Sequence, residues 1–291
     1  MPSVPASLKR SLKKPLESSL ALDAAVIEAG LPVEVAQAID SIEVFDSIAS
    51  TQSYLKDQSL KNQGSSNRLC VAESQLAGKG RRGREWVAAG KGDVLLSLSW
   101  AYESAPIDLS ALSLAVVAEI AECLVVRYAL PIKIKWPNDL LLLNEKLAGF
   151  IVDVETGKHC QVTIGIGLNV AARNATSVKA INQPATTLSN AGVHDVDRND
   201  LIAEMVSRLA KLLIVYPDVG FSAYKSKWES FAAYIGEQVI LQRRDNSDNN
   251  LADIVVAGVL ESVDEQGCLC VRDVSGEMHK ILDSELSLRL L

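Results

Sequence analysis

The densest group of charged side chains is a glycine-rich loop at residues 75–86, Gln-Leu-Ala-Gly-Lys-Gly-Arg-Arg-Gly-Arg-Glu-Trp. Three glycines and four cations fall within the seven positions 78–84. Glycine lets the backbone approach a ligand closely, and neighbouring cations repel one another unless an anion joins them. The loop therefore favours a site for a phosphate chain, or for a phosphate together with a carboxylate. On spacing alone, a solvated basic loop and a nucleic-acid contact stay open as alternatives.

This loop differs from two common phosphate-binding motifs. No Gly-Lys-Ser or Gly-Lys-Thr ends it, and a strand rather than a helix is expected after it. It is therefore neither a Walker loop nor a dinucleotide-binding fingerprint.

Three further motifs place polar groups or glycines at the ends of apolar strands. Residues 135–139, Lys-Trp-Pro-Asn-Asp, lie between two apolar runs, where proline redirects the chain and Asn138 and Asp139 reach the strand mouth. Lys146 begins the next apolar strand. The glycines of 165–169, Gly-Ile-Gly-Leu-Asn, alternate and leave one strand face bare, which suits a flat ring such as a purine. Taken singly, these motifs also fit a β-turn, a solvated lysine and close packing of sheet on helix.

Hydrophobic periodicity predicts the elements that position these motifs. Strands are expected at residues 42–45, 68–74, 93–100, 132–136, 139–143, 147–155 and 161–170, and helices at 50–59, 109–128, 201–216 and 221–231. The 109–128 helix is expected to have one apolar face, with Glu119 and Glu122 elsewhere. Two short helices are expected between residues 20 and 39. After Gly236, short strands at 237–244, 254–263, 267–274 and 277–283 predict a small barrel.

Composition excludes several classes of protein. The 291 residues are 48% apolar and 22% charged, which rules out disorder over most of the chain. A net charge of −7 means that nucleic-acid binding needs a local basic patch. The five cysteines form no Cys-x-x-Cys pair, and three histidines are too few for a His-rich metal site. The sequence has neither an apolar run long enough for a membrane span nor a secretory signal, so the cytoplasm is the expected compartment.

In this order and at these distances, the four motifs closely resemble those of biotin protein ligases, which attach biotin to carboxylase carrier proteins. The resemblance runs from about Ile42 to the C-terminus, and its motifs lie at residues 78–86, 135–139, 145–155 and 164–170. It implies an α+β fold, with a mixed-sheet catalytic domain related to class II aminoacyl-tRNA synthetases and lipoyl ligases, followed by a small SH3-like β-barrel. We therefore expect a partly disordered N-terminal extension over residues 1–39, a biotin- and ATP-binding catalytic domain over 40–235, and the barrel over 236–291.

The resemblance also implies roles for individual residues. Lys146, Arg81 and Asp139 match catalytic positions, with Lys146 at the biotin carboxylate and α-phosphate and Asp139 facing the carrier lysine. The implied biotin-binding residues are Ser50, Thr51, Gln52, Gln75, Lys79, Gly80, Arg81 and Lys146. The implied ATP-binding residues are Arg81, Arg84, Trp86, Asn138, Gly149 and Asn169. Gln52 stands where the family has asparagine, and Lys79 where arginine is usual, which keeps the charge but loses the bidentate fork.

The implied reaction activates biotin with ATP to biotinyl-5′-AMP and then transfers biotin to a lysine of the biotin carboxyl carrier protein of acetyl-CoA carboxylase. It implies ATP and Mg²⁺, and the sequence does not identify the metal ligands. A lipoyl or octanoyl ligase of the same fold is the nearest alternative, and a nucleic-acid-binding protein that uses the basic glycine loop is a more distant one.

Some members of the family carry an N-terminal winged helix and repress biotin synthesis. About 40 residues precede the catalytic domain here, so we expect no sequence-specific DNA binding. We also expect no membrane association, and a monomer or a homodimer.

Overall fold

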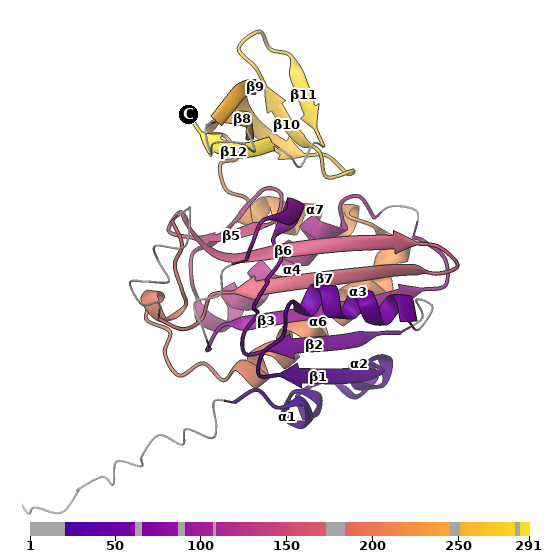
Figure 1. The fold of residues 1–291 in the computed structure, drawn as a ribbon. Coiled ribbons are helices and arrows are strands. Elements are labelled where there is room, and N and C mark those ends of the chain that lie inside the picture. Colours follow the sequence, from indigo (N-terminus) through magenta and orange to yellow (C-terminus); the bar gives the residue numbers. More distant parts are fainter. Residues whose placement is uncertain are drawn as a thin grey trace, which may run out of the picture.

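A seven-stranded mixed sheet forms the centre of the large domain in the computed structural model (Figure 1). The structure describes residues 21–61, 66–86, 91–106, 109–172, 184–244, 251–282 and 286–291. The expected disordered start of the chain lies outside the described residues.

The strand order in this sheet is β1-β2-β3-β7-β6-β5-β4. The strands are β1 Ser41–Phe45, β2 Arg68–Ala72, β3 Val94–Tyr102, β4 Ile132–Lys135, β5 Asp139–Leu142, β6 Glu145–Thr156 and β7 Cys160–Leu168. β1 and β2 are parallel, because a helix connects them, and the other neighbouring pairs are antiparallel. All seven strands fall where the hydrophobic pattern predicts them.

Helices cover both faces of the sheet (Figure 1). α3, Thr51–Lys61, packs on one face against β2, β3 and β7. On the other face lie α4, Leu112–Tyr128, and α6, Arg198–Val219, while α7, Ser222–Phe231, packs against α4 and β4. Two 3₁₀ turns are described, η2 Arg81–Gly83 and η3 Ser189–Ala191.

α4 is buried on more sides than its sequence pattern indicates. It lies between the sheet and the helices α6 and α7, so even Glu119 is only 9% exposed. Lys227 of α7 pairs with this carboxylate. The expected apolar face is present, but the pattern could not show that charged partners on other helices would close over the opposite face.

The segment before β1 packs onto the large domain. α1, Ala24–Ala29, and α2, Val33–Ala38, contact α6, and their apolar side chains join the main hydrophobic core. The backbone N–H of Leu22 donates to Glu73, which also pairs with the buried Arg198 at 2.7 Å. Residues 21–39 therefore share a core with the following domain, and a boundary near residue 39 stays a prediction.

The small domain is a five-stranded antiparallel sheet in the order β11-β10-β9-β8-β12. Its strands are β8 Gln238–Arg244, β9 Leu251–Val263, β10 Leu269–Arg272, β11 Met278–Ile281 and β12 Leu286–Leu290. The sequence analysis predicted the first four and missed β12, although the buried Leu286 and Leu288 alternate with more exposed residues in the period expected of a strand. Of the helices described, none is both long and apolar enough to cross a membrane.

Candidate active site

The site is built on the face of the sheet that carries α3. Gly165 and Gly167 of β7 point their bare Cα atoms to this face, because alternate residues of a strand share a face. An ideal Cβ would lie 2.5 Å from Gln52 Oε1 at Gly165, and 2.3 Å from Trp86 Cε2 at Gly167. The alternating glycines do make room for flat groups, and here those groups are a glutamine amide and an indole ring.

The first turn of α3 and Gln75 form a rigid polar wall. The side-chain oxygen of Gln75 accepts hydrogen bonds from the backbone N–H of Thr51, at 2.8 Å, and from its hydroxyl, at 3.2 Å. Ser50, 2% exposed, precedes α3, and its hydroxyl accepts the N–H of Ser53. An amide fixed through its oxygen presents its NH₂ group in a defined direction. Gln75 Nε2 consequently lies by the basic loop, 3.4 Å from the position of a Cβ on Gly78.

Gln52 is held by contacts within the protein. Its Nε2 donates to the carbonyl of Thr163 at 3.0 Å and to Asp153 at 3.2 Å, and its Oε1 accepts the hydroxyl of Ser97 at 3.1 Å. Both donors of the amide are therefore engaged. Sequence reasoning missed Ser97, Asp153 and Thr163, although a polar residue inside an apolar strand is a signal that could have found them.

Lys56 extends this network along α3. Its ammonium lies 3.3 Å from Asp153 and 3.3 Å from Glu155. Partial burial acts to lower the pKa of Lys56, but the two carboxylates outweigh burial and raise that pKa. Lys56 therefore stays charged and holds Asp153 where it accepts from Gln52.

The basic loop is a short hairpin that is hydrogen-bonded at its base. The N–H of Trp86 donates to the carbonyl of Gly78 at 2.9 Å, and the N–H of Gly80 donates to Arg84 at 2.6 Å. Gly78 has to be glycine, because a Cβ there would lie 2.6 Å from the carbonyl oxygen of Trp86. The tip is the turn η2, where Gly83 has a φ of +71°. Lys79, Arg81 and Arg84 are therefore carried by one short hairpin.

Arg81 connects this loop to the turn between β4 and β5. Its Nη1 donates to Asn138 Oδ1 at 3.0 Å, and the amide nitrogen of Asn138 donates to the carbonyl of Phe150. Two motifs that are 57 residues apart in the sequence thus meet through one hydrogen bond. Lys79 is exposed, as is Arg84, whose Nε donates to the Arg81 carbonyl at 3.3 Å.

Lys146 and Asp139 form an ion pair on neighbouring strands, with 2.7 Å between Nζ and Oδ1. The two side chains are 17% and 23% exposed. The ammonium lies 5.5 Å from the ring centroid of Trp86, within range of a cation–π contact. A Cβ on Gly149 would lie 2.8 Å from the Trp86 ring and 3.1 Å from Lys146 Nζ, so the missing side chain makes room for both.

Asn169 acts on the backbone around Lys146. It is 1% exposed, and its amide nitrogen donates to the carbonyls of Lys146, at 3.2 Å, and Thr186, at 3.0 Å. Asn169 therefore helps to fix the backbone of the strand that carries Lys146.

A cavity of about 1010 Å³ opens beside these groups. Five of the predicted site residues line it: Gln52, Lys79, Gly80, Arg81 and Asn138. The other predicted residues are not among its lining residues: Ser50, Thr51, Gln75, Arg84, Trp86, Asp139, Lys146, Gly149 and Asn169. Lys146 does not line the cavity because the indole of Trp86 occupies the space beside it, against Gly149 and Gly167. Sequence reasoning also missed Gly267 and Leu282, which reach the cavity from the small domain.

Two carboxylates near the cavity already have partners within the protein. Asp139 is paired with Lys146, and Asp153 with Lys56 and Gln52. Mg²⁺ in nucleotide sites is held largely through substrate phosphates and one or two carboxylates.

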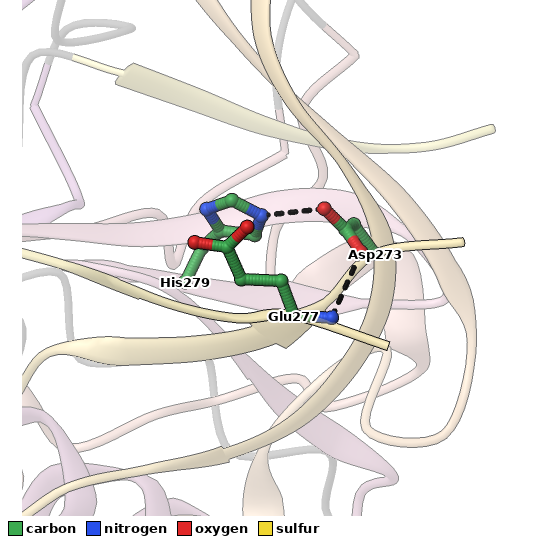
Figure 2. A group of neighbouring side chains, drawn as sticks. All are labelled: Asp273, Glu277 and His279. Carbon is green, nitrogen blue, oxygen red and sulfur yellow. Dashed lines mark hydrogen bonds and ion pairs between the residues drawn. The ribbon is translucent and has the colours of Figure 1, made fainter. Parts of the chain in front are cut away.

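One group of possible metal ligands among the described residues lies away from the cavity lining, at the turn between β10 and β11 (Figure 2). It consists of Asp273, Glu277 and His279, and Asp273 Oδ2 lies 2.8 Å from His279 Nε2. The other oxygen of Asp273 accepts the N–H groups of Ser275 and Glu277. The hydrogen bond from His279 is the main reason that the pKa of Asp273 lies well below its usual range. These contacts hold the hairpin turn together.

Comparison with known proteins shows the family to which this chain belongs. Residues 44–169 match the Biotin/lipoate A/B protein ligase family. The bifunctional ligase/repressor BirA of Salmonella typhimurium is 35% identical over 251 residues, 86% of this chain and 74% of the relative. The biotin–[acetyl-CoA-carboxylase] ligase of Mycobacterium tuberculosis is 30% identical over 213 residues, 72% of this chain and 74% of the relative.

A solved structure agrees with these relatives. The biotin protein ligase from Aquifex aeolicus in complex with biotin and ATP superposes with a TM-score of 0.71 at 26% identity, and the match covers 87% of this chain and 100% of that chain. The chain belongs to the biotin protein ligase family. The family and the α+β fold class that the four motifs predict are thereby confirmed.

Proposed function

We propose that this protein activates biotin with ATP, transfers it to a carrier lysine, and uses the sheet face under α3 for both steps. The observation that carries the proposal is that the basic loop lies beside the amide of Gln75 at Gly78, and beside the ammonium of Lys146 through Trp86. Arg81 of the same loop adds a second cation, and Thr51 fixes the amide of Gln75. Such an arrangement suits a neutral polar ring joined to a carboxylate that must approach a polyphosphate.

In the first step, a carboxylate oxygen of biotin attacks the α-phosphorus of ATP. The new oxygen–phosphorus bond forms as the bond to the bridging oxygen of the β-phosphate breaks, and pyrophosphate leaves. Repulsion between the two anions dominates the barrier, so positioned cations lower it most. Lys146 and Arg81 supply this charge, and Mg²⁺ bound to the polyphosphate would neutralise a further part of the negative charge.

In the second step, a carrier lysine attacks the acyl carbon of biotinyl-5′-AMP and AMP leaves. The attacking amine has to be neutral and has to lose a proton as the amide forms. Asp139 is suited to accept it, because the ammonium of Lys146 can turn from this carboxylate to the phosphate once the substrates bind. The carrier that we propose is the biotin carboxyl carrier protein of acetyl-CoA carboxylase, in keeping with the named activity of the Mycobacterium tuberculosis relative.

The remaining predicted residues divide into direct contacts and supports. The side-chain NH₂ group of Gln75 is suited to contact biotin, because the oxygen of this amide is fixed by Thr51. The amide of Gln52 is already hydrogen-bonded within the protein, so Gln52 supports the site. The Trp86 indole and the bare glycines beneath it form the nucleotide side. Asn169 supports Lys146 through its backbone.

The test is ATP–pyrophosphate exchange with the purified protein. Exchange should depend on added biotin and should not respond to lipoate or octanoate. Exchange with lipoate and none with biotin would favour the related lipoyl-ligase reaction, and exchange with neither would contradict the proposal. Transfer is then measured as incorporation of labelled biotin into the carrier domain.

A further inference from the structure

We infer that Gly267, in a turn of the small domain, is a positioning residue for the ligase reaction, acting through Trp136 on the contact between Asn138 and Arg81. The inference rests on the proposed function, because it assigns a role to the contact between the two domains in that same reaction.

The turn between β9 and β10 touches the large domain at two points. The carbonyl of Gly267 accepts a buried hydrogen bond from the indole Nε1 of Trp136 at 3.3 Å. The neighbouring carbonyl of Gln266 accepts the hydroxyl of Ser110 at 3.2 Å. Trp136 itself is only 4% exposed, so the first of these bonds is shielded from water. The turn therefore supplies the partner of an indole that would otherwise have a buried donor without an acceptor.

Only glycine fits at position 267, for two separate reasons. Its φ is +80°, which is costly for any residue with a Cβ. A Cβ there would also lie 2.9 Å from the Cβ of Ala111 and 3.0 Å from Leu114 Cδ1, at the start of α4. At Gly267, the backbone of the small domain therefore packs directly against the start of α4.

Asp264 holds the turn in this shape. Its carboxylate accepts the N–H groups of Gln266, at 3.1 Å, and Cys268, at 2.9 Å, and its carbonyl accepts the N–H of Gly267 at 3.0 Å. Lys280 of β11 pairs with the same carboxylate at 3.2 Å. Partial burial opposes the charge of Asp264, but these hydrogen bonds outweigh burial and lower its pKa. The carbonyl of Gly267 is therefore presented to Trp136 by a turn that is already ordered.

Trp136 lies in the same turn as the partner of Arg81. It stands two positions before Asn138 in the tight turn between β4 and β5, and Asn138 accepts the hydrogen bond from Arg81. Trp136, Asn138, Arg81 and Gly267 line the same cavity. Because the hydrogen bond to Gly267 holds the indole of Trp136, it also restrains the turn to which Trp136 belongs. This turn positions Asn138 Oδ1, the atom that accepts the hydrogen bond from Arg81. The small domain thereby helps to hold the basic loop on the nucleotide side.

The experiment compares two matched pairs of variants by pyrophosphate exchange and thermal melting. Trp136→Phe removes the indole donor, and Trp228→Phe is its control, because Trp228 is also buried but its Nε1 has no hydrogen-bond partner in the described structure. Trp136→Phe should raise the KM for ATP roughly two- to tenfold, as expected for one lost hydrogen bond, and change kcat less than about twofold. Trp228→Phe should leave both constants at the parent values.

The second pair keeps the test decisive if Trp136→Phe folds poorly. Gly267→Ala and Gly276→Ala both place a Cβ at positive φ, +80° and +88°, but position 276 has nothing within 4 Å of that Cβ. Both should lower the melting temperature, and only Gly267→Ala should raise the KM for ATP. A double variant tests the route of the effect: in an Asn138→Ala background, Trp136→Phe should add less than about twofold.

Equal KM values for Trp136→Phe and Trp228→Phe, or for the two glycine variants, would overturn the inference. So would an effect of Trp136→Phe that persists in full in the Asn138→Ala background. Failure of the proposed function looks different, because the parent protein itself would then show no biotin-dependent exchange.

Discussion

The Cα of Gly167 lies directly against the indole of Trp86, so close that a Cβ added to the glycine would meet ring atoms at 2.3 and 2.5 Å. The same ring lies against Gly149 on the neighbouring strand and within 5.5 Å of the Lys146 ammonium. The Nε1 of Trp86 is buried and has no hydrogen-bond partner within the described structure. An aromatic ring, two bare strand positions and the cation of an ion pair are thus packed together at the centre of the proposed nucleotide side.

Gly167→Ala should therefore lower kcat/KM for ATP about tenfold or more, because overpacking forces the indole away from the sheet. Steady-state pyrophosphate exchange measures the effect. Gly157→Ala is the control, since Gly157 comes directly after β6, has open space around it and should behave as the parent does. Activity of Gly167→Ala within twofold of the parent would show that the ring is not part of the nucleotide side.

Lys146→Ala should reduce the rate of adenylate formation about 10²- to 10³-fold, because it removes a cation aimed at developing negative charge. Single-turnover formation of biotinyl-5′-AMP is the direct measurement, with circular dichroism to confirm the fold. Lys158→Ala removes an exposed lysine from the turn after β6 and should leave the rate unchanged. A folded Lys146→Ala protein with full activity would remove this residue from the mechanism.

Asp139→Asn should separate the two steps. Adenylate formation should stay within about threefold of the parent, whereas transfer to the carrier should fall about 10²-fold, the usual effect of losing a proton acceptor. The two rates are measured separately, with preformed adenylate used for the second. Glu145→Gln neutralises an exposed carboxylate on the adjoining strand and is the control. Equal losses in both steps would mean that Asp139 acts only by placing Lys146.

Glu73→Gln should destabilise the large domain by about 3–5 kcal/mol at pH 7, because it removes the carboxylate that pairs with the buried Arg198. Urea unfolding measures this change. Glu261→Gln breaks the exposed pair with Arg272 and should have little effect.

The pH dependence of this loss has a defined sign. Burial acts to raise the pKa of Glu73, but the hydrogen bonds from Arg198 and Leu22 outweigh burial and hold that pKa below its ordinary value of 4.5. A carboxyl whose folded-state pKa is lowered contributes its full stability above the unfolded value and loses it as pH falls through the folded value. The difference between parent and Glu73→Gln should therefore be constant above about pH 5 and shrink below pH 4.5. A difference that grows on acidification would contradict this assignment.

Most of the helices and strands, and the chemistry of the motifs, could be predicted from the amino-acid pattern alone. Alternating and helical periodicity depend on near neighbours, so they placed β1 to β7, α3 and the long helices, and the glycines and cations of residues 78–84 marked an anion loop between two strands. Which side chains meet could not be predicted, because it depends on how distant segments pack together. Arg81 donates a hydrogen bond to Asn138, and the amide of Gln52 donates to Thr163 and Asp153. The indole of Trp136 donates to the carbonyl of Gly267, which lies 131 residues later in the chain. These contacts follow from strand order and from how one domain docks on the other, which local sequence patterns do not encode.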